Sequence, residues 1–264
     1  MNKEFALVTG ASKGLGKAFA FELSKRKMNT ILIGLPDEGL DLLTNELKNK
    51  YEVESVFYET DLTIKENILK LAAWVNENFS VSILINNAGV GGTKEFLNAD
   101  VNYIDRIIQL NIRATSILTH QILPNLLKQP QAYILYVSSM AAFSPIGFKT
   151  VYPASKAFID YFSRGLHQEL SGTNIFISTV HPGSMKTNRD VTERINKLGT
   201  YGKLGLLPPE KVAEISINQL FKKNPVIHLN ASNVFNRFLI KIIPAWIRLP
   251  VITRVIKKRE IDRE

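Results

Sequence analysis

The stretch that decides the fold is Thr9-Gly10-Ala11-Ser12-Lys13-Gly14-Leu15-Gly16, which lies between an apolar run at residues 5–8 and an amphipathic segment at residues 14–27. Glycines in such a turn let the backbone pass tightly from a strand into a helix and approach a pyrophosphate. The start of the helix then directs free N–H groups and a positive dipole end at the anion. The spacing is G-x-x-x-G-x-G, and its place between strand and helix argues against an ordinary Gly-rich turn. We expect a nucleotide-binding turn.

Apolar runs and helical segments alternate along the rest of the chain. Further runs lie at residues 30–33, 53–58, 82–85, 132–137, 175–180 and 226–229. The clearest helical spacing of three and four lies at residues 14–27, 39–50, 65–78, 101–127 and 152–170. Near-continuous apolar strands between amphipathic helices are typical of a parallel sheet covered on both faces. The pattern predicts an α/β fold with a doubly wound parallel sheet of about seven strands, and ligands on such sheets bind beyond the carboxyl ends of the strands.

Composition narrows the class of protein. The 264 residues can bury one large core, so we expect a single domain. The net charge of +9 raises nucleic acid and anionic lipid as partners, but residues 237–264 alone hold eight Lys/Arg against three Asp/Glu. Because no nucleic-acid-binding motif occurs elsewhere, we expect no nucleic-acid partner. The absence of cysteine excludes disulfides and Cys-ligated metals, and we expect no metal site.

Targeting signals are absent from the sequence given. The apolar run at residues 5–8 is far too short for the core of a signal peptide. Charges and prolines interrupt the C-terminal region before it reaches the roughly 20 apolar residues of a membrane span. We therefore expect a cytoplasmic protein that does not cross a membrane.

A second motif, Tyr152-Pro153-Ala154-Ser155-Lys156, opens the predicted helix at residues 152–170. A Tyr and a Lys four residues apart share one helix face, so the ammonium can favour the phenolate electrostatically. With 8 Tyr in the chain this spacing also arises by chance, so its neighbours decide. Ser139 follows the fifth strand, Asn87 lies at the end of the fourth, and Asn111 lies in the next long helix.

Together these motifs resemble the short-chain dehydrogenase/reductase family of the Tyr-Lys type, over about residues 5–230. The resemblance implies a Rossmann-type NAD(P)-binding domain whose catalytic group is Asn111, Ser139, Tyr152 and Lys156. It also implies that Asp61 meets the adenine, that Asn87-Ala88-Gly89 supports the sheet near the cofactor, and that residues 182–187 follow the nicotinamide. The implied cofactor contacts are Gly10, Ser12, Lys13, Gly14, Leu15, Gly16, Gly34, Leu35, Asp61, Leu62, Asn87, Ala88, Gly89, Tyr152, Lys156, Pro182, Gly183, Met185 and Thr187.

The chemistry of carbonyl reduction agrees with these roles. Hydride delivery leaves charge on the carbonyl oxygen, which needs a proton donor and a second hydrogen-bond donor. Tyr152 would donate the proton and Ser139 would orient the oxygen. A free phenol has a pKa of about 10, so we expect Lys156 and an oxidised nicotinamide to lower the pKa of Tyr152. By the same resemblance, Lys156 holds the nicotinamide ribose and the main chain at Asn111 carries a water.

Two function classes other than an oxidoreductase are compatible with this sequence. The first is a nucleotide-binding sensor or scaffold without turnover, because fold does not determine function. The second is an adaptor that binds nucleic acid or membrane through its basic tail. The sensor class usually lacks a catalytic residue, and this chain has all four, so the sequence favours an NAD(P)(H)-dependent oxidoreductase. No histidine is expected in the site, and His181 is interpreted as a strand-end residue.

Cofactor and substrate are less constrained. The second strand ends at Gly34 and Leu35, neither carboxylate nor arginine, while Lys13 occupies a position that is often basic in NADP-preferring relatives. Asp37 favours NAD(H) if its loop folds back. Because Lys13 lies in the turn itself, we predict a modest preference for NADP(H), with NAD(H) open. The apolar residues 140–146 and an expected lid at residues 187–207 favour an apolar ketone or alcohol.

The substrate branch rests on similarity. Residues 149–170 and the apolar C-terminus are similar to the branch that contains long-chain 3-oxoacyl-CoA reductases and 17β-hydroxysteroid dehydrogenases. A short-chain reductase of 3-oxoacyl carrier protein is the alternative. It is less favoured because no Arg pair is apparent at the ends of the two relevant helices to receive an acidic carrier.

The last two expectations concern the oligomeric state and the C-terminal extension. Relatives pair through the helices that here correspond to residues 101–127 and 152–170, so we expect a homodimer or homotetramer. We divide the chain into a catalytic domain at residues 1–230 and an apolar, basic extension at residues 231–264, which Pro244 and Pro250 should split into short helices. The extension either packs over the substrate pocket or a neighbouring subunit, or lies on an anionic membrane surface.

Overall fold

Seven strands form one parallel sheet in the computed structural model, which describes residues 3–183, 185 and 206–261. The strand order is β3-β2-β1-β4-β5-β6-β7 and every pair is parallel. The strands are β1 Glu4–Thr9, β2 Asn29–Gly34, β3 Ser55–Glu59, β4 Ser80–Asn86, β5 Ala132–Val137, β6 Ile175–Val180 and β7 Val226–Ile227. The predicted α/β class, sheet type and strand number are confirmed.

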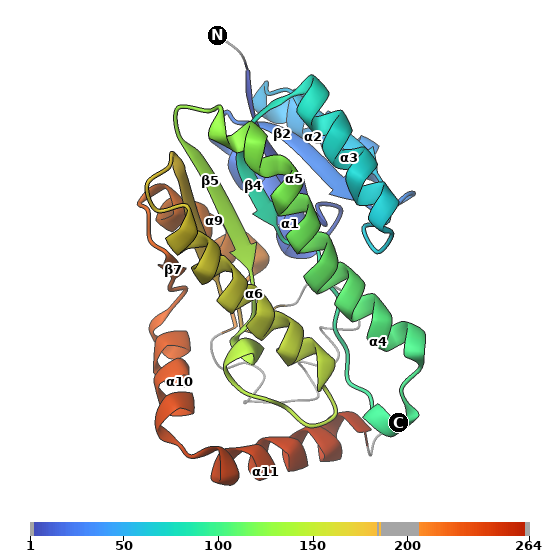
Figure 1. Cartoon of the computed structure of the whole chain (residues 1–264), viewed down its shortest axis with the longest axis vertical. Coiled ribbons are helices and arrows are strands. Elements are labelled where there is room, and N and C mark those ends of the chain that lie inside the picture. The colour runs from blue at the N-terminus through green and yellow to red at the C-terminus, as the bar shows by residue number, and fades with distance from the viewer. Residues whose placement is uncertain (1–2, 184, 186–205, 262–264) are drawn as a thin grey trace.

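Helices cover both faces of this sheet, because alternate strand residues point to opposite sides. In β1, Ala6 and Val8 belong to one buried cluster and Phe5 and Leu7 to another. The first cluster packs under α1 Gly14–Lys25, α2 Leu40–Tyr51 and α9 Pro209–Phe221. The second packs under α3 Lys65–Asn78, α5 Thr115–Leu127 and α6 Val151–Glu169. Figure 1 shows α5 and α6 side by side on the near face and α9 behind the sheet.

The long helix expected at residues 101–127 is interrupted by a wider turn. It begins as α4 Val101–Ile107, continues as the π-helical segment η2 Ile108–Ala114 and ends as α5. Such π segments change which backbone groups are paired and often occur at functional sites. Asn111 lies in the middle of this one, so its placement is a local feature that the three-and-four spacing does not reveal.

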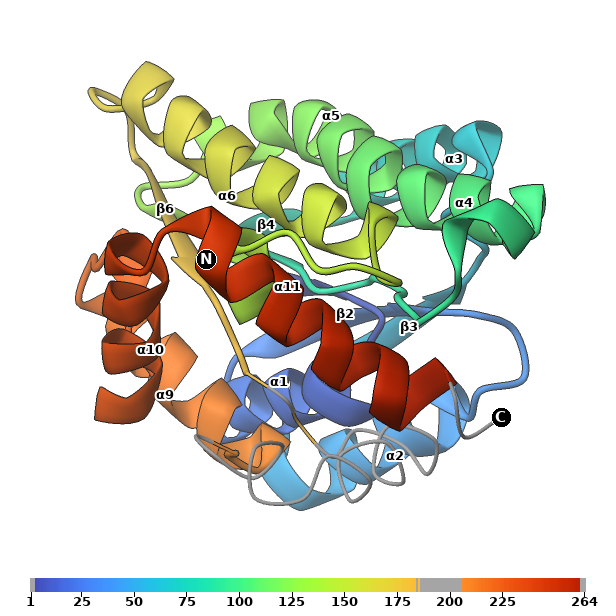
Figure 2. The same ribbon diagram turned by 90° about the horizontal axis from the view of Figure 1, so that it is seen from below.

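The C-terminal extension forms two helices and a final turn, α10 Ala231–Ile242, α11 Ala245–Ile256 and η4 Lys257–Ile261. Pro244 separates α10 from α11, as predicted. The prediction that Pro250 also ends a helix is wrong, because Pro250 lies inside α11. Its side chain is exposed, so water can bond the carbonyl that proline leaves without a donor. Seen from below, α11 crosses the carboxyl ends of the central strands (Figure 2).

Candidate active site

The cavity lies where the order of the strands reverses. The chain leaves β1 toward β2 and leaves β4 toward β5, so the loops after these adjacent strands diverge and open a crevice. A cavity of about 820 Å³ occupies this place. It extends from the turn after β1 to the start of α6 and reaches α10 and α11, so it can receive a dinucleotide and a second molecule side by side.

The Gly-rich turn is shaped by contacts that only glycine permits. Gly10 has a φ of +64° and Gly14 a φ of +56°, both in the left-handed region. At Gly16 a Cβ would lie 1.9 Å from the Gly10 carbonyl oxygen, so the helix could not approach the turn this closely with any other residue. Asn87 holds the same turn from β4, since its Nδ2 donates to the Thr9 oxygen over 2.9 Å and to the Gly10 oxygen over 3.2 Å.

The first turn of α1 fits the phosphates of a dinucleotide. The N-cap residue Lys13 makes no side-chain cap hydrogen bond among the described residues, which leaves the N–H groups of this turn for a ligand. Gly10, Ser12 and Leu15 line the cavity around the helix start. A glycine cradle beside an uncapped helix start is therefore a site for a pyrophosphate.

Glu38 is a residue of this region that the sequence reasoning missed. Its carboxylate accepts hydrogen bonds from Ser12 Oγ and, over 2.5 Å, from Lys13 Nζ, and it lines the cavity. Partial burial alone would raise the pKa of Glu38, but the bonds from Lys13 and Ser12 outweigh it and hold the pKa below its usual value. The left-handed backbone at Asp37, with φ +61°, carries the chain back toward the turn. From the sequence we considered only Asp37 as the carboxylate near the end of β2, because no local pattern distinguishes Asp37 from Glu38.

Asn111 and Lys156 meet at Gly89, at the floor of the cavity. A Cβ at Gly89 would lie 3.1 Å from Asn111 Oδ1 and 3.2 Å from Lys156 Nζ. The Asn111 amide donates to the Val90 oxygen and to Ser155 Oγ, each over 2.9 Å, and accepts from the Val90 N–H. The Asn111 side chain thus lies behind the cavity and does not line it, and the catalytic role that the family resemblance implies for Asn111 stays a prediction.

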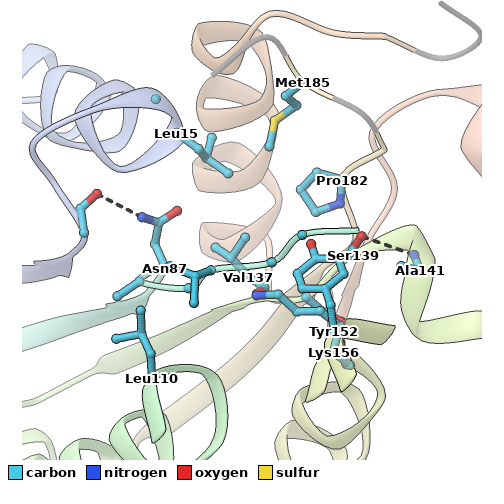
Figure 3. Close-up of a pocket in the computed structure, with 18 of the residues that line it drawn as sticks. Leu15, Asn87, Leu110, Val137, Ser139, Ala141, Tyr152, Lys156, Pro182 and Met185 are labelled. Atoms are coloured by element: carbon cyan, nitrogen blue, oxygen red, sulfur yellow. Dashed lines mark hydrogen bonds between the residues drawn. The ribbon is translucent and has the colours of Figure 1, made fainter. Parts of the chain in front are cut away.

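Tyr152, Ser139 and Lys156 face the cavity together, as Figure 3 shows. Burial raises the pKa of the Tyr152 phenol, and a hydrogen bond with Ser139 offsets part of that rise. Burial is the larger of the two effects in the structure, and the lowering expected from Lys156 together with an oxidised nicotinamide stays a prediction. Burial lowers the pKa of Lys156 to about 8, and its ammonium donates to the Val137 oxygen over 2.9 Å.

Hydrogen bonds with backbone groups position the elements that carry Ser139, Tyr152 and Lys156. Ser139 Oγ accepts from the Ala141 N–H over 3.1 Å and caps η3 Met140–Phe143. Ser138 Oγ donates to the Lys156 oxygen over 2.8 Å and so ties α6 to the end of β5. The loop after β6 is held by a bond from the Met140 N–H to the Pro182 oxygen over 2.9 Å.

His181 forms a buried pair that its interpretation as a plain strand-end residue omits. Its Nε2 lies 2.8 Å from Asp160 Oδ1, and Arg164 Nε donates to the same oxygen over 3.1 Å. Burial lowers the pKa of His181, while Asp160 opposes that shift and Arg237 and Arg164 add to it. Asp160 lies one turn after Lys156 on α6, so the pair links the catalytic helix to the loop after β6.

Most of the predicted residues line the cavity. Those that do are Gly10, Ser12, Lys13, Gly14, Leu15, Gly34, Leu35, Asp61, Leu62, Asn87, Ala88, Gly89, Ser139, Tyr152, Lys156, Pro182, Gly183 and Met185. Gly16 and Asn111 do not, since each packs behind it. Thr187 and most of the expected lid lie outside the described residues. Within the described part of the chain, no group of three His, Asp or Glu could hold a metal ion.

The side of the cavity beyond Ser139 and Tyr152 is mostly apolar. Met140, Ala141 and Ile146 line it from the loop after β5. Ile240 from α10 and Ile252 and Ile256 from α11 complete the lining. The sequence offered packing of the extension over the substrate pocket as one alternative, but it did not indicate that these three isoleucines are the ones that line the cavity, because contacts with a loop a hundred residues away leave no local signal.

Comparison with known proteins identifies the family. The model of the short chain dehydrogenase family matches residues 4–197. The chain belongs to this family.

One relative is a very-long-chain 3-oxoacyl-CoA reductase from Anas platyrhynchos, 37% identical over 182 residues, which make up 67% of this chain and 58% of that protein. The matched part thus spans less than two thirds of that relative. The expected similarity to this branch is confirmed.

Solved structures share the fold. A 7β-hydroxysteroid dehydrogenase superposes with a TM-score of 0.82 at 22% identity, covering 92% of this chain and 95% of that one. A short-chain dehydrogenase from Sphingobium yanoikuyae in complex with NADPH superposes with a TM-score of 0.77 at 24% identity, covering 91% and 96%. At 22% and 24% sequence identity, the similarity to these structures supports the fold of this chain and no particular activity.

Proposed function

We propose that the protein is an NAD(P)(H)-dependent oxidoreductase that reduces an apolar ketone or oxidises the corresponding alcohol. The observation that carries this proposal is the group of Tyr152, Ser139 and Lys156, which together line one cavity whose other end is the Gly-rich turn. Family membership supports it, because the four residues that the family uses are all present.

Tyr152 is the proton donor in this proposal. When bound, the reduced nicotinamide supplies the hydride that the substrate carbon receives. The carbonyl oxygen gains negative charge as that carbon is attacked, and the Tyr152 hydroxyl donates its proton to the oxygen. Ser139 donates a hydrogen bond to the same oxygen and stabilises the charge. A phenol kept protonated by burial is suited to the donation.

Lys156 stabilises the phenolate that Tyr152 becomes. Its ammonium lies 6.0 Å from the centre of the Tyr152 ring, within reach of a Coulomb interaction at a buried position. The Val137 carbonyl accepts a hydrogen bond from the ammonium and so holds the lysine in place. Lys156 would also donate to the hydroxyls of the nicotinamide ribose.

The substrate proposed is an apolar ketone of the 3-oxoacyl or steroid-like type. Its support is the apolar lining at Ile146, Ile240, Ile252 and Ile256, together with the names of the matched reductases. For the cofactor, Lys13 supports NADP(H), whereas the Glu38 carboxylate pairs with Lys13 and opposes a 2′-phosphate. The preference for NADP(H) thus stays a prediction, with NAD(H) open.

Tyr152→Phe tests the proposed function. We expect the variant to fold and to bind cofactor, and to lose about 10²–10⁴ of kcat on a ketone substrate, because the acid is removed. Tyr161→Phe is the matched control, since Tyr161 lies on the same helix with 78% of its surface exposed. A panel of ketones and alcohols, followed by nicotinamide absorbance with both cofactors, identifies the substrate first. Near-normal turnover by Tyr152→Phe contradicts the mechanism.

We further propose a homodimer or homotetramer in the cytoplasm, with contact between the C-terminal helices and a membrane. The oligomer proposal rests on exposed apolar side chains of α4 and α6, among them Val101 and Tyr161 at 77% and 78% exposure. The cytoplasmic location stays the expectation stated from the sequence. Light scattering at micromolar concentration tests the assembly, and a monomer contradicts it.

A further inference from the structure

The helices α10 and α11 are held on the molecule by their inner side. Ile240, Ile252 and Ile256 line the cavity. Thr253 packs so closely on Gly147 that a Cβ there would lie 2.5 Å from Thr253 Cγ2. Arg248 donates to Ser144 Oγ from α11. The two helices are therefore docked on the body of the protein, with α11 across the carboxyl ends of the strands and α10 to one side of it (Figure 2).

The outer side of the same helices is apolar and faces solvent. We define the outer face as Val234, Phe235, Phe238, Ile242, Trp246 and Val251. Phe235 and Phe238 are 59% and 57% exposed, and Trp246, just after the turn between the helices, is 77% exposed. Isolated exposed apolar residues are ordinary, but a run of large ones along two consecutive helices marks a surface that is covered by something else.

The basic residues near the outer face indicate which kind of surface it binds. Between residues 230 and 259 the chain holds seven Lys/Arg and no Asp or Glu. Arg254, Lys257 and Lys258 are exposed beside the outer face. A second copy of this chain would bring the same charges against its own, which opposes pairing through this face. An anionic lipid surface offers both negative charge to the basic residues and an acyl layer to the aromatic ones.

We infer that the outer face of α10 and α11 binds the surface of an anionic lipid bilayer. The helices lie in the interface and do not cross it, because 12 residues at about 1.5 Å each span far less than the roughly 30 Å of a hydrocarbon core. In the described part of the chain, no helix is long and apolar enough to span a membrane. The apolar cavity then lies about one helix diameter, roughly 10 Å, from the lipid.

Vesicle sedimentation tests this binding with the full chain and without turnover. We expect the protein to pellet with vesicles of phosphatidylcholine and phosphatidylglycerol in equal parts, at least tenfold more than with pure phosphatidylcholine, and to be released by 0.5 M salt. The variant Phe235→Ser/Phe238→Ser/Trp246→Ser should lose at least tenfold of the binding. Its control, Leu42→Ser/Ile64→Ser/Leu97→Ser, removes three exposed apolar residues elsewhere and should bind normally.

A charge-reversal pair isolates the electrostatic part. Arg254→Glu/Lys257→Glu/Lys258→Glu should abolish the preference for anionic vesicles. The control Lys48→Glu/Lys65→Glu/Lys70→Glu changes the net charge equally on exposed positions of α2 and α3 and should keep it. Equal loss in both would show a non-specific effect of net charge and overturn the inference.

Tryptophan fluorescence reports the orientation. The chain has 2 Trp, and Trp74 packs between Tyr58 and Phe79. In Trp74→Phe, emission from Trp246 should shift to the blue when anionic vesicles are added, and in Trp246→Phe no shift should appear. A protein that stays in the supernatant at low salt, or an outer-face variant that instead turns an oligomer into a monomer, overturns the inference. None of these readouts depends on the proposed activity.

Discussion

Gly16→Ala is the substitution whose effect the structure constrains most tightly. A Cβ at Gly16 would lie 1.9 Å from the Gly10 oxygen and 2.7 Å from Asn87 Nδ2, where contacts below 3.0 Å essentially never occur. The start of α1 must therefore move by about 1 Å, from 1.9 Å to at least 3.0 Å. The Gly10 oxygen is itself held, because Asn87 Nδ2 donates to it over 3.2 Å and to the Thr9 oxygen over 2.9 Å.

Two opposing effects set the magnitude. Alanine improves helix propensity over glycine by about 0.5–1 kcal/mol. Forcing the closely packed turn apart costs about 1–3 kcal/mol, so the clash prevails. We expect the free energy of unfolding to fall by roughly 1–2 kcal/mol, or about 2–8 °C in Tm for a chain of this size. A shift of about 1 Å in the phosphate cradle should also weaken cofactor binding, because the N–H groups of the turn no longer meet the phosphates at hydrogen-bond distance.

Gly165→Ala is the matched control. Gly165 lies inside α6, and no atom lies within 4 Å of the position that a Cβ would take there, so the same substitution should raise the free energy of unfolding by about 0.5–1 kcal/mol. Thermal unfolding followed by circular dichroism, and cofactor titration by fluorescence, measure both variants. Unchanged stability and unchanged cofactor affinity in Gly16→Ala would refute the reasoning.

The remaining predictions concern charge. Because burial lowers the pKa of Lys156 to about 8, reductive kcat/KM should fall as pH rises through about 8, where the ammonium loses its proton; a flat profile from pH 6 to 10 contradicts this role. Glu38→Gln should free Lys13 and raise the affinity for NADPH relative to NADH by about three- to tenfold, measured by fluorescence titration of both cofactors, and an unchanged ratio counts against it. His181 has a lowered folded pKa, so unfolded chains bind its proton first and stability should fall as pH drops below about 6.5, by up to about 1.4 kcal/mol per pH unit. Urea unfolding at pH 7.5 and 5.5 should show this slope in His228→Gln, an exposed control, and lose it in His181→Gln; equal slopes in both variants would exclude His181 as the cause.

Local patterns in the sequence were sufficient for the fold and the main site. The seven apolar runs predict a parallel sheet because burial on both faces leaves strands such as β1 and β4 with no exposed position after their first residue. Tyr152 and Lys156 are four residues apart on one helix, and Gly10, Gly14 and Gly16 lie in one turn. These groups are close in the chain, so their spacing, taken together with Ser139 and Asn111, was enough to predict the site.

Only the tertiary structure decided which distant groups meet. Glu38 reaches Ser12 because the backbone at Asp37 turns back, and His181 meets Asp160 because β6 ends beside α6. Ile252 and Ile256 lie in the cavity and Trp246 outside it, although all three are apolar residues of one helix. A sequence determines how apolar a helix is, whereas the side it presents to the core depends on what it packs against.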